Sequence, residues 1–215
     1  MTIQKRSRAQ IVERVAQDIP AGASVNLGIG LPTKVASYLK PEHEIILHSE
    51  NGVLGFGALT VQVDADEDLI NAGKELVQML DGGSFMHSAD SFDIMRGGHL
   101  DICILGAFQV AINGDLANWH TGATDALPAV GGAMDLAVGD HAVYVCMEHL
   151  TKQGTSKIVD VLSYPVTGEQ CVNRIYTDLC IIDLKDHQAF VTEIVEGLSF
   201  DELKQKTGCH LIDAR

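Results

Sequence analysis

Basic residues, long apolar runs and paired cysteines are scarce in this sequence, and each shortage excludes a class of protein. Fifteen lysines and arginines face 29 acidic residues in 215, which gives a formal net charge of −14. Because the phosphate backbone repels such a chain, we expect no nucleic acid partner. No run reaches the length of roughly 18 apolar residues at which a membrane-spanning helix is predicted, so we expect no membrane association either.

Cysteine and histidine are present without the spacings that indicate disulfide or metal chemistry. The five cysteines are odd in number and form no C-x-x-C pair, and Cys103 and Cys146 lie inside apolar runs, where a thiol usually packs as a small hydrophobe. The basic cluster at 5–8 is not followed by the apolar segment of a signal peptide. We therefore expect a cytoplasmic protein with reduced thiols. The nine histidines show no H-E-x-x-H spacing, so no metal site is predicted.

Helical and strand patterns alternate along the chain. An amphipathic helix is predicted over 7–19, a strand over 24–27, a helix that begins near Pro32, and a short buried strand over Ile45–Leu47. Further apolar runs predict strands at 100–105, 142–147, 179–184 and, as the last strand, 189–195, followed by a capped helix from Ser199. No linker or repeat interrupts this order. We therefore predict one α/β domain over residues 1–215 with a mostly parallel sheet.

Glu50 stands where the strand around Ile45–Leu47 ends. Asn51 and Gly52 follow it, and this pair readily adopts the left-handed backbone angles of a tight turn. Ligand crevices in open α/β sheets form beyond strand ends, so a carboxylate at this position can be aimed at a ligand. The residues alone leave a second interpretation open, in which Glu50 is a solvated turn acid without function.

Gly131 and Gly132 are the most suggestive of the glycine clusters. They lie within the segment 128–135, where bare backbone N–H groups could approach a ligand oxygen as an oxyanion hole requires. An ordinary tight turn before a helix that starts near Asp135 explains the same residues equally well.

A dinucleotide-binding site is an alternative for the N-terminal part. Gly28 and Gly30 follow a predicted strand, and Glu50 comes 20 residues after Gly30, where such sites carry a ribose-binding acid. Thr33 replaces the third glycine of the G-x-G-x-x-G pattern, however, which weakens this interpretation.

Several sequence blocks resemble the B (β) subunit of the 3-oxoacid CoA-transferases. The specific block is Ser-Glu-Asn-Gly within 47–55, and the resemblance extends over nearly the whole chain through 26–32, 96–99, 114–119 and 131–135. Within the family, 120–123 and 174–179 are most similar to the enzymes that use 3-oxoadipate in aromatic catabolism, whereas the acetoacetate and butyrate enzymes are the nearer alternative.

The resemblance implies a fold and a set of roles. The family fold is an open, mostly parallel sheet with helices on both faces, similar to that of ribose-phosphate isomerase. Glu50 would be the nucleophile that forms a glutamyl-CoA thioester, and Gly131 and Gly132 would lie at the active site and hold the thioester oxygen. Asn51, Gly28 and Gly30 would shape the pocket.

The resemblance also implies partners. Coenzyme A would be a substrate, delivered as succinyl-CoA, with no permanently bound cofactor and no metal. A separate A (α) subunit would complete the active site in a hetero-oligomer of a prokaryotic cytoplasmic enzyme. A dinucleotide-binding oxidoreductase and a non-catalytic sensor domain remain as alternatives from other classes of function.

Overall fold

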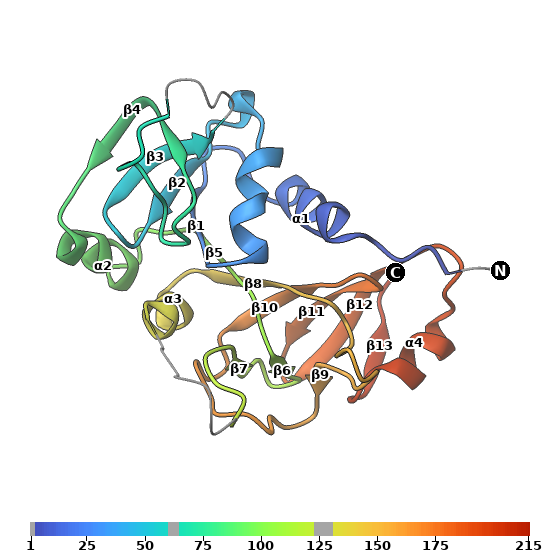
Figure 1. Ribbon diagram of the computed structural model, residues 1–215. Helices are drawn as coiled ribbons and strands as arrows, with labels where there is room; N and C mark the ends of the chain where they lie inside the picture. The colour runs from blue at the N-terminus through green and yellow to red at the C-terminus, as the bar shows by residue number, and fades with distance from the viewer. Residues whose placement is uncertain (1–2, 60–64, 123–130) are drawn as a thin grey trace.

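The computed structural model describes residues 3–59, 65–122 and 131–215. A ten-stranded sheet has the strand order β13-β12-β11-β10-β8-β5-β1-β2-β3-β4 (Figure 1). Its strands are β1 (Ser24–Leu27), β2 (Ile46–Ser49), β3 (Val53–Ala58), β4 (Val77–Phe85), β5 (Ile102–Leu105), β8 (Ala142–Cys146), β10 (Val172–Tyr176), β11 (Cys180–Lys185), β12 (Gln188–Ile194) and β13 (Leu211–Asp213). A second sheet has the order β7-β6-β9 and contains β6 (Gln109–Ala111), β7 (Leu116–Ala117) and β9 (Ile158–Val159).

The centre of the large sheet is parallel and its flanks are antiparallel. Strands β2, β1, β5, β8 and β10 all run in the same direction. Strands β3 and β4 extend the sheet antiparallel on one side, and β11 and β12 do so on the other. The predicted mostly parallel sheet is therefore confirmed at its centre. Because parallel strands end at the same edge, the carboxyl ends of β2, β1, β5 and β8 lie side by side, roughly 4.8 Å apart from one strand to the next.

The helices are formed by segments with recognisable ends. They are α1 (Arg8–Gln17), the 3₁₀ helices η1 (Leu31–Tyr38) and η2 (Pro41–His43), α2 (Ser88–Arg96), α3 (Ala133–Val138) and α4 (Phe200–Lys206). Ser7 and Ser199 cap α1 and α4, each in a reciprocal capping box that satisfies backbone N–H groups of the first turn. The helix predicted after Pro32 is a 3₁₀ helix, which fits the short span between Gly30 and Pro41.

Two apolar cores lie on opposite faces of the large sheet. Along β5, Ile102 and Ile104 belong to the core beneath α1 and η1, whereas Cys103 and Leu105 belong to the core that includes residues of α2, α3 and α4. This alternation follows from the two-residue period of a strand and explains why its sequence is apolar throughout. Figure 1 shows α1 and η1 on one side of the sheet and the small sheet on the other. The open α/β sheet with helices on both faces is confirmed.

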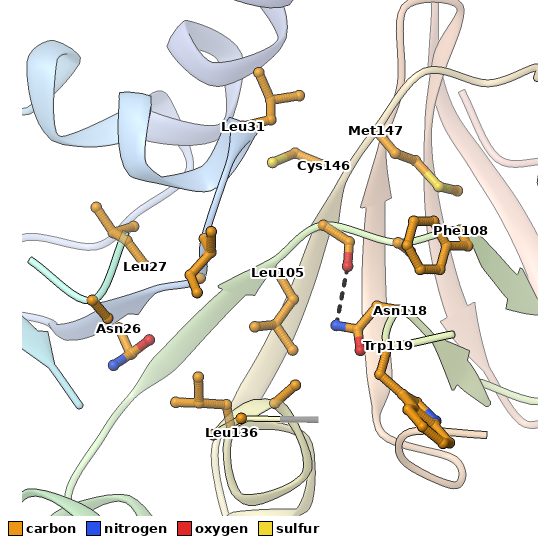
Figure 2. Close-up of a pocket in the computed structure, with 18 of the residues that line it drawn as sticks. Asn26, Leu27, Leu31, Leu105, Phe108, Asn118, Trp119, Leu136, Cys146 and Met147 are labelled. Carbon is orange, nitrogen blue, oxygen red and sulfur yellow. Dashed lines mark hydrogen bonds between the residues drawn. The ribbon is translucent and has the colours of Figure 1, made fainter. Parts of the chain in front are cut away.

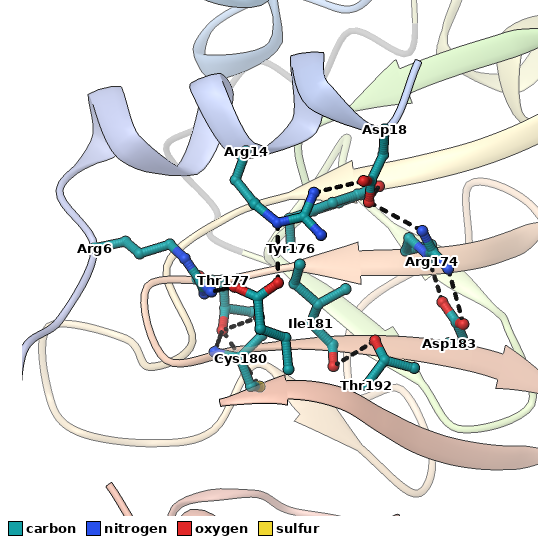
Figure 3. A network of polar contacts seen from close by, with 11 residues as sticks. Arg6, Arg14, Asp18, Arg174, Tyr176, Thr177, Cys180, Ile181, Asp183 and Thr192 are labelled. Carbon is teal, nitrogen blue, oxygen red and sulfur yellow. Dashed lines mark hydrogen bonds and ion pairs between the residues drawn. The ribbon is translucent and has the colours of Figure 1, made fainter. Parts of the chain in front are cut away.

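A network of charged side chains fastens α1 to the sheet (Figure 3). Asp18, the C-cap of α1, accepts hydrogen bonds from the Arg174 guanidinium at 3.0 Å and from the Tyr176 hydroxyl at 2.8 Å. Arg174 also pairs with Asp183, and Arg14 pairs with Asp18. Arg174 and Tyr176 lie in the segment most similar to the 3-oxoadipate enzymes, yet both side chains are engaged in this network.

The strand at 189–195 is not the last one, as the sequence pattern predicted. Strand β13 pairs with β12 in parallel beyond it and forms the edge of the sheet. Only Leu211 of its three residues is buried, so the segment is too short to show strand periodicity. Across the three described ranges, no helix is long and apolar enough to cross a membrane, and no cluster of metal-ligating side chains is found.

Candidate active site

A cavity of about 550 Å³ lies at the carboxyl edge of the parallel strands (Figure 2). Each of four adjacent strands delivers residues to it just beyond its last residue: Glu50 follows β2, Gly28 follows β1, Gly106 follows β5 and Met147 follows β8. The remaining walls are largely apolar and include Leu27, Leu31, Leu105, Phe108, Leu136 and Cys146. A carboxylate, several glycines and apolar walls thus lie together at the carboxyl edge of the sheet.

The turn after β2 places Glu50 in this cavity. Gly52, with φ +99°, donates its N–H to the carbonyl of Ser49 at 3.0 Å and closes the turn. A Cβ on Gly52 would lie 2.2 Å from the carbonyl oxygen of Met86, so only glycine fits this position. The prediction that Asn51–Gly52 forms a tight turn is confirmed.

The carboxyl group of Glu50 is held in a partly dehydrated and negatively charged environment. Burial raises its pKa above the ordinary value, and the negative charge of Asp135 raises that pKa further. Within residues 3–59, 65–122 and 131–215, burial and the charge of Asp135 are the influences on this carboxyl group, and no hydrogen-bond donor is among them. Among the described residues, no hydrogen bond therefore holds the carboxyl group of Glu50.

Gly132 lies directly against the carboxyl group of Glu50. A Cβ on Gly132 would lie 2.0 Å from Oε2 of Glu50 and 2.9 Å from its Cδ, so any other residue would displace the carboxylate. Gly131 has φ +54° and, like Gly132, lines the cavity. The two glycines also form the turn before α3, which begins at Ala133, two residues before Asp135, as the tight-turn interpretation predicted. Residues 128–130 of the same block lie outside the described residues. The oxyanion role of the N–H groups stays a prediction.

The other predicted pocket residues separate into two groups. Gly28 lines the cavity, and a Cβ there would lie 2.9 Å from Cδ2 of Leu105. Gly30 and Asn51 are not among the described residues that line it. Gly30, with φ +94°, leads into η1, and the amide of Asn51 donates to the carbonyl of Ile70 at 2.8 Å. Pocket-shaping roles for Gly30 and Asn51 stay predictions.

Asn118 and Trp119 line the cavity on the side of the small sheet. The side-chain amide of Asn118 donates to the carbonyl of Gly106 at 3.2 Å (Figure 2), and its oxygen accepts from the hydroxyl of Thr167. The Trp119 indole donates to the carbonyl of Val166 and stacks on His120 with ring centroids 5.4 Å apart. Trp119 is the single tryptophan of the chain, and this was the feature of the sequence that could have indicated a place in the site.

Cationic side chains line the end of the cavity that is formed by β8. Arg8 and Lys157 line this end together with Glu148. The pKa of Lys157 is lowered, chiefly because burial disfavours its charged form. The β2 end with Glu50 is separated from the β8 end by β1 and β5, so Glu50 and the two cationic groups stand at opposite ends of the cavity.

Most of the chain matches one protein family. The model of the coenzyme A transferase family matches residues 8–206. The chain belongs to the coenzyme A transferase family. The resemblance indicated by the Ser-Glu-Asn-Gly block is thereby confirmed.

Relatives of this CoA-transferase chain that match over almost their whole length carry subunit names. The chain is 63% identical over 214 residues to the B subunit of the 3-oxoadipate CoA-transferase of Acinetobacter baylyi, a match that covers 100% of this chain and 99% of the relative. It is 45% identical over 200 residues to the B subunit of the succinyl-CoA:3-ketoacid coenzyme A transferase of Helicobacter pylori, covering 93% and 96% of the two chains.

The fold of the CoA-transferase chain also matches a solved structure. The apoenzyme of the acyl-CoA transferase YdiF from Escherichia coli O157:H7 superposes with a TM-score of 0.76 at 16% identity, over 100% of this chain and 43% of that one. At this identity the likeness concerns the fold alone. Membership of the family removes the ground for the dinucleotide-binding interpretation of Gly28, Gly30 and Glu50.

Proposed function

We propose that this chain is the B subunit of a 3-oxoadipate CoA-transferase and that Glu50 is its nucleophile. The observation that carries the proposal is the 63% identity, over the full length of both chains, to a relative with that name. The location of Glu50 supports it, because its carboxyl group lines a cavity and is not engaged by a described hydrogen-bond donor. In the proposed reaction, succinyl-CoA donates CoA and 3-oxoadipate accepts it.

The first half of the reaction moves CoA onto the protein. The Glu50 carboxylate attacks the thioester carbonyl of succinyl-CoA, and the tetrahedral intermediate expels the CoA thiolate to leave a mixed anhydride between Glu50 and succinate. The thiolate then attacks the side-chain carbonyl of Glu50 and expels succinate. The product is a thioester between Glu50 and CoA, formed without consumption of water or a proton.

The second half repeats these steps in reverse order. A carboxylate of 3-oxoadipate attacks the Glu50 thioester and expels the thiolate, which then attacks the acyl carbonyl of the new mixed anhydride. The products are 3-oxoadipyl-CoA and free Glu50. One thioester is broken and one is formed, so the free energy of the thioester bond is conserved.

The cavity suits this chemistry in two respects. Burial raises the pKa of Glu50, and a more basic carboxylate is a stronger nucleophile. Apolar walls formed by Leu27, Leu105 and Leu136 limit access of water, which would hydrolyse the anhydride and the thioester. The absence of a side chain at Gly132 leaves room for the carboxyl group that reacts.

The proposed partner is an A subunit that completes the active site. The relatives from Acinetobacter baylyi and Helicobacter pylori are both named as B subunits, which implies a second kind of subunit in those enzymes. Ile29 and Phe108 line the cavity and still expose 66% and 40% of their surface. Such exposed apolar residues at the cavity are suited to burial beneath another chain.

Trapping the covalent intermediate tests the proposal. Holoenzyme mixed with succinyl-CoA and no acceptor should accumulate CoA on Glu50, and intact-mass spectrometry should find this chain heavier by one CoA residue. Adding 3-oxoadipate should discharge the adduct faster than adding acetoacetate. Glu50→Gln, which keeps the shape but is a poor nucleophile, should form no adduct. An adduct on another residue would contradict the mechanism, and faster discharge by acetoacetate would favour the 3-ketoacid enzymes as the substrate class.

A further inference from the structure

A chain of buried polar side chains lies behind Glu50 and joins three elements. Asn26 of β1, His48 of β2 and Ser91 of α2 expose 2%, 1% and 0% of their surface. The Asn26 amide nitrogen is 2.9 Å from Nδ1 of His48, and Nε2 of His48 is 2.8 Å from the hydroxyl of Ser91. The hydroxyl of Ser91 is in turn 3.0 Å from the carbonyl oxygen of Ser49.

The hydrogen bonds in this series can have only one order of donors and acceptors. The amide nitrogen of Asn26 donates, so Nδ1 of His48 accepts and its proton is on Nε2. Nε2 therefore donates to the Ser91 hydroxyl, which donates its own proton to the carbonyl of Ser49. The imidazole is neutral in this arrangement, in agreement with a pKa that burial lowers to about 4.

The hydrogen bonds end on the backbone just before the nucleophile. Asn26 also donates to the carbonyl oxygen of His48 at 3.2 Å, so the carbonyls of both residues preceding Glu50 are held by buried side chains. The hydroxyl of Ser49 accepts from the N–H of Ala72 at 2.9 Å. The carboxyl group of Glu50 has no such described partner. The backbone held by these hydrogen bonds determines where the Glu50 side chain begins.

We propose that Ser91 and His48 are positioning residues that hold the end of β2 so that Glu50 points into the cavity. This inference rests on the proposed role of Glu50 as nucleophile. A reacting group must be held within roughly 0.5 Å of its productive position, and a displacement of about 1 Å can cost a factor of 100 in rate. Loss of the Ser91 hydroxyl removes one of the two hydrogen bonds to the carbonyl of Ser49, which keeps only the bond from the N–H of Gly52. It also leaves Nε2 of His48 without an acceptor.

The chain contains a matched control for this network. His149 is also fully buried, with its pKa lowered to about 4, and its Nε2 lies 3.0 Å from the hydroxyl of Thr207. Thr207 donates to the carbonyl of Leu203 at 2.8 Å, just as Ser91 donates to that of Ser49. Thr207 is at the end of α4, and it does not line the cavity. Loss of its hydroxyl should therefore affect stability without an effect on Glu50.

The test compares Ser91→Ala with Thr207→Val in holoenzyme reconstituted with the A subunit. Both variants should lower Tm. In single-turnover experiments, Ser91→Ala should slow formation of the Glu50–CoA adduct by about 10- to 100-fold at saturating succinyl-CoA, because the nucleophile is misplaced. The concentration for half-maximal rate should change less than about threefold. Thr207→Val should keep the adduct rate within about twofold.

Conservative variants separate positioning from folding. Ser91→Thr keeps the hydroxyl and should retain most of the rate, and His48→Gln keeps a donor toward Ser91 and should be faster than His48→Leu. These comparisons decide the question even if Ser91→Ala does not fold. A folded Ser91→Ala enzyme with the wild-type adduct rate, or equal losses in Ser91→Ala and Thr207→Val, would overturn the positioning role and leave the nucleophile intact. A wild-type enzyme without an adduct on Glu50 would instead overturn the proposed function.

Discussion

Gly132 illustrates how a missing side chain serves the chemistry of a neighbour. Its Cα stands where a Cβ would lie 2.0 Å from Oε2 of Glu50, and the carboxylate occupies the space. A hydrogen atom is the only side chain that leaves both groups in position. We therefore expect the absence of a side chain at Gly132 to matter sterically, in addition to the predicted oxyanion role of its N–H.

Gly132→Ala should therefore remove activity by displacing Glu50. We expect kcat to fall by at least about 100-fold, because the methyl group and the carboxylate cannot occupy the same place. The matched control is Gly57→Ala on β3, where the added Cβ would meet only the end of the Leu80 side chain at 3.2 Å. Steady-state assays of both variants, with circular dichroism to confirm folding, decide the matter. Normal turnover by Gly132→Ala would contradict the geometry.

Asp135 influences Glu50 through charge. Its carboxylate raises the pKa of Glu50, and it is itself paired with Arg96 at 2.7 Å. Since the proposed mechanism requires Glu50 as a carboxylate, activity should be lost as the pH falls through its pKa. Asp135→Asn should lower that pKa and move the acid limb of the kcat/KM profile to lower pH. Arg96→Gln, which leaves the charge of Asp135 unpaired, should move it the opposite way. A profile that is identical in all three proteins would exclude this coupling.

At the scale of secondary-structure elements, two buried histidines act as cross-links. His48 joins β2 to α2 through Ser91, and His149 joins the segment after β8 to the end of α4 through Thr207. Each neutral ring uses one nitrogen as donor and one as acceptor. Protonation would convert the acceptor into a donor and break the arrangement.

Acid should therefore destabilise the fold over a defined pH range. Burial lowers the pKa of both histidines from 6.5 to about 4. Between these values the unfolded chain binds protons that the folded chain does not, so the free energy of unfolding should fall as the pH is lowered from about 6.5 to about 4. Urea denaturation at a series of pH values measures this. His149→Gln should reduce the slope, and a wild-type slope of zero in this range would refute the assignment.

At the scale of the whole molecule, the cavity is formed by the ends of several strands at one edge of the sheet and not by a single sequence motif. Strand order β2-β1-β5-β8 places Glu50 and Gly28 beside residues that are more than 50 positions away in the sequence. Exposed Ile29 at this edge fits the proposal that a second chain covers it. Activity should accordingly depend on assembly.

The isolated chain should show no CoA transfer, and addition of an A subunit should restore it. The reason is that exposed apolar residues border the proposed active site, and the proposed partner would cover them and exclude water. Turnover measured against the concentration of the A subunit, with size-exclusion chromatography of the complex, tests this. Glu50→Gln should assemble normally and remain inactive. Full turnover by the chain alone would contradict the expectation.

Local patterns in the sequence determined much of the fold and pointed to the proposed nucleophile. Continuous apolar runs located the central strands, because a strand buried on both faces has no polar side. The Asn51–Gly52 turn located Glu50 at a strand end, and the Ser-Glu-Asn-Gly block indicated its family. The capping box at Ser199 located the start of α4. These features are local, so they can be recognised without knowledge of contacts across the sheet.

Only the tertiary structure decided which residues act together. Gly132 lies so close to Glu50 that a Cβ on it would be 2.0 Å from Oε2 of Glu50, and Trp119 lies at the cavity. Both placements follow from the strand order, which a linear sequence pattern does not contain. Strand β13 escaped prediction because three residues are too few to show periodicity. Ser91 and His48 are 43 positions apart in the sequence, and nothing in the sequence around a helical serine indicates which residue its hydroxyl will bond. Its role depends on burial and direction, which exist only once the chain has folded.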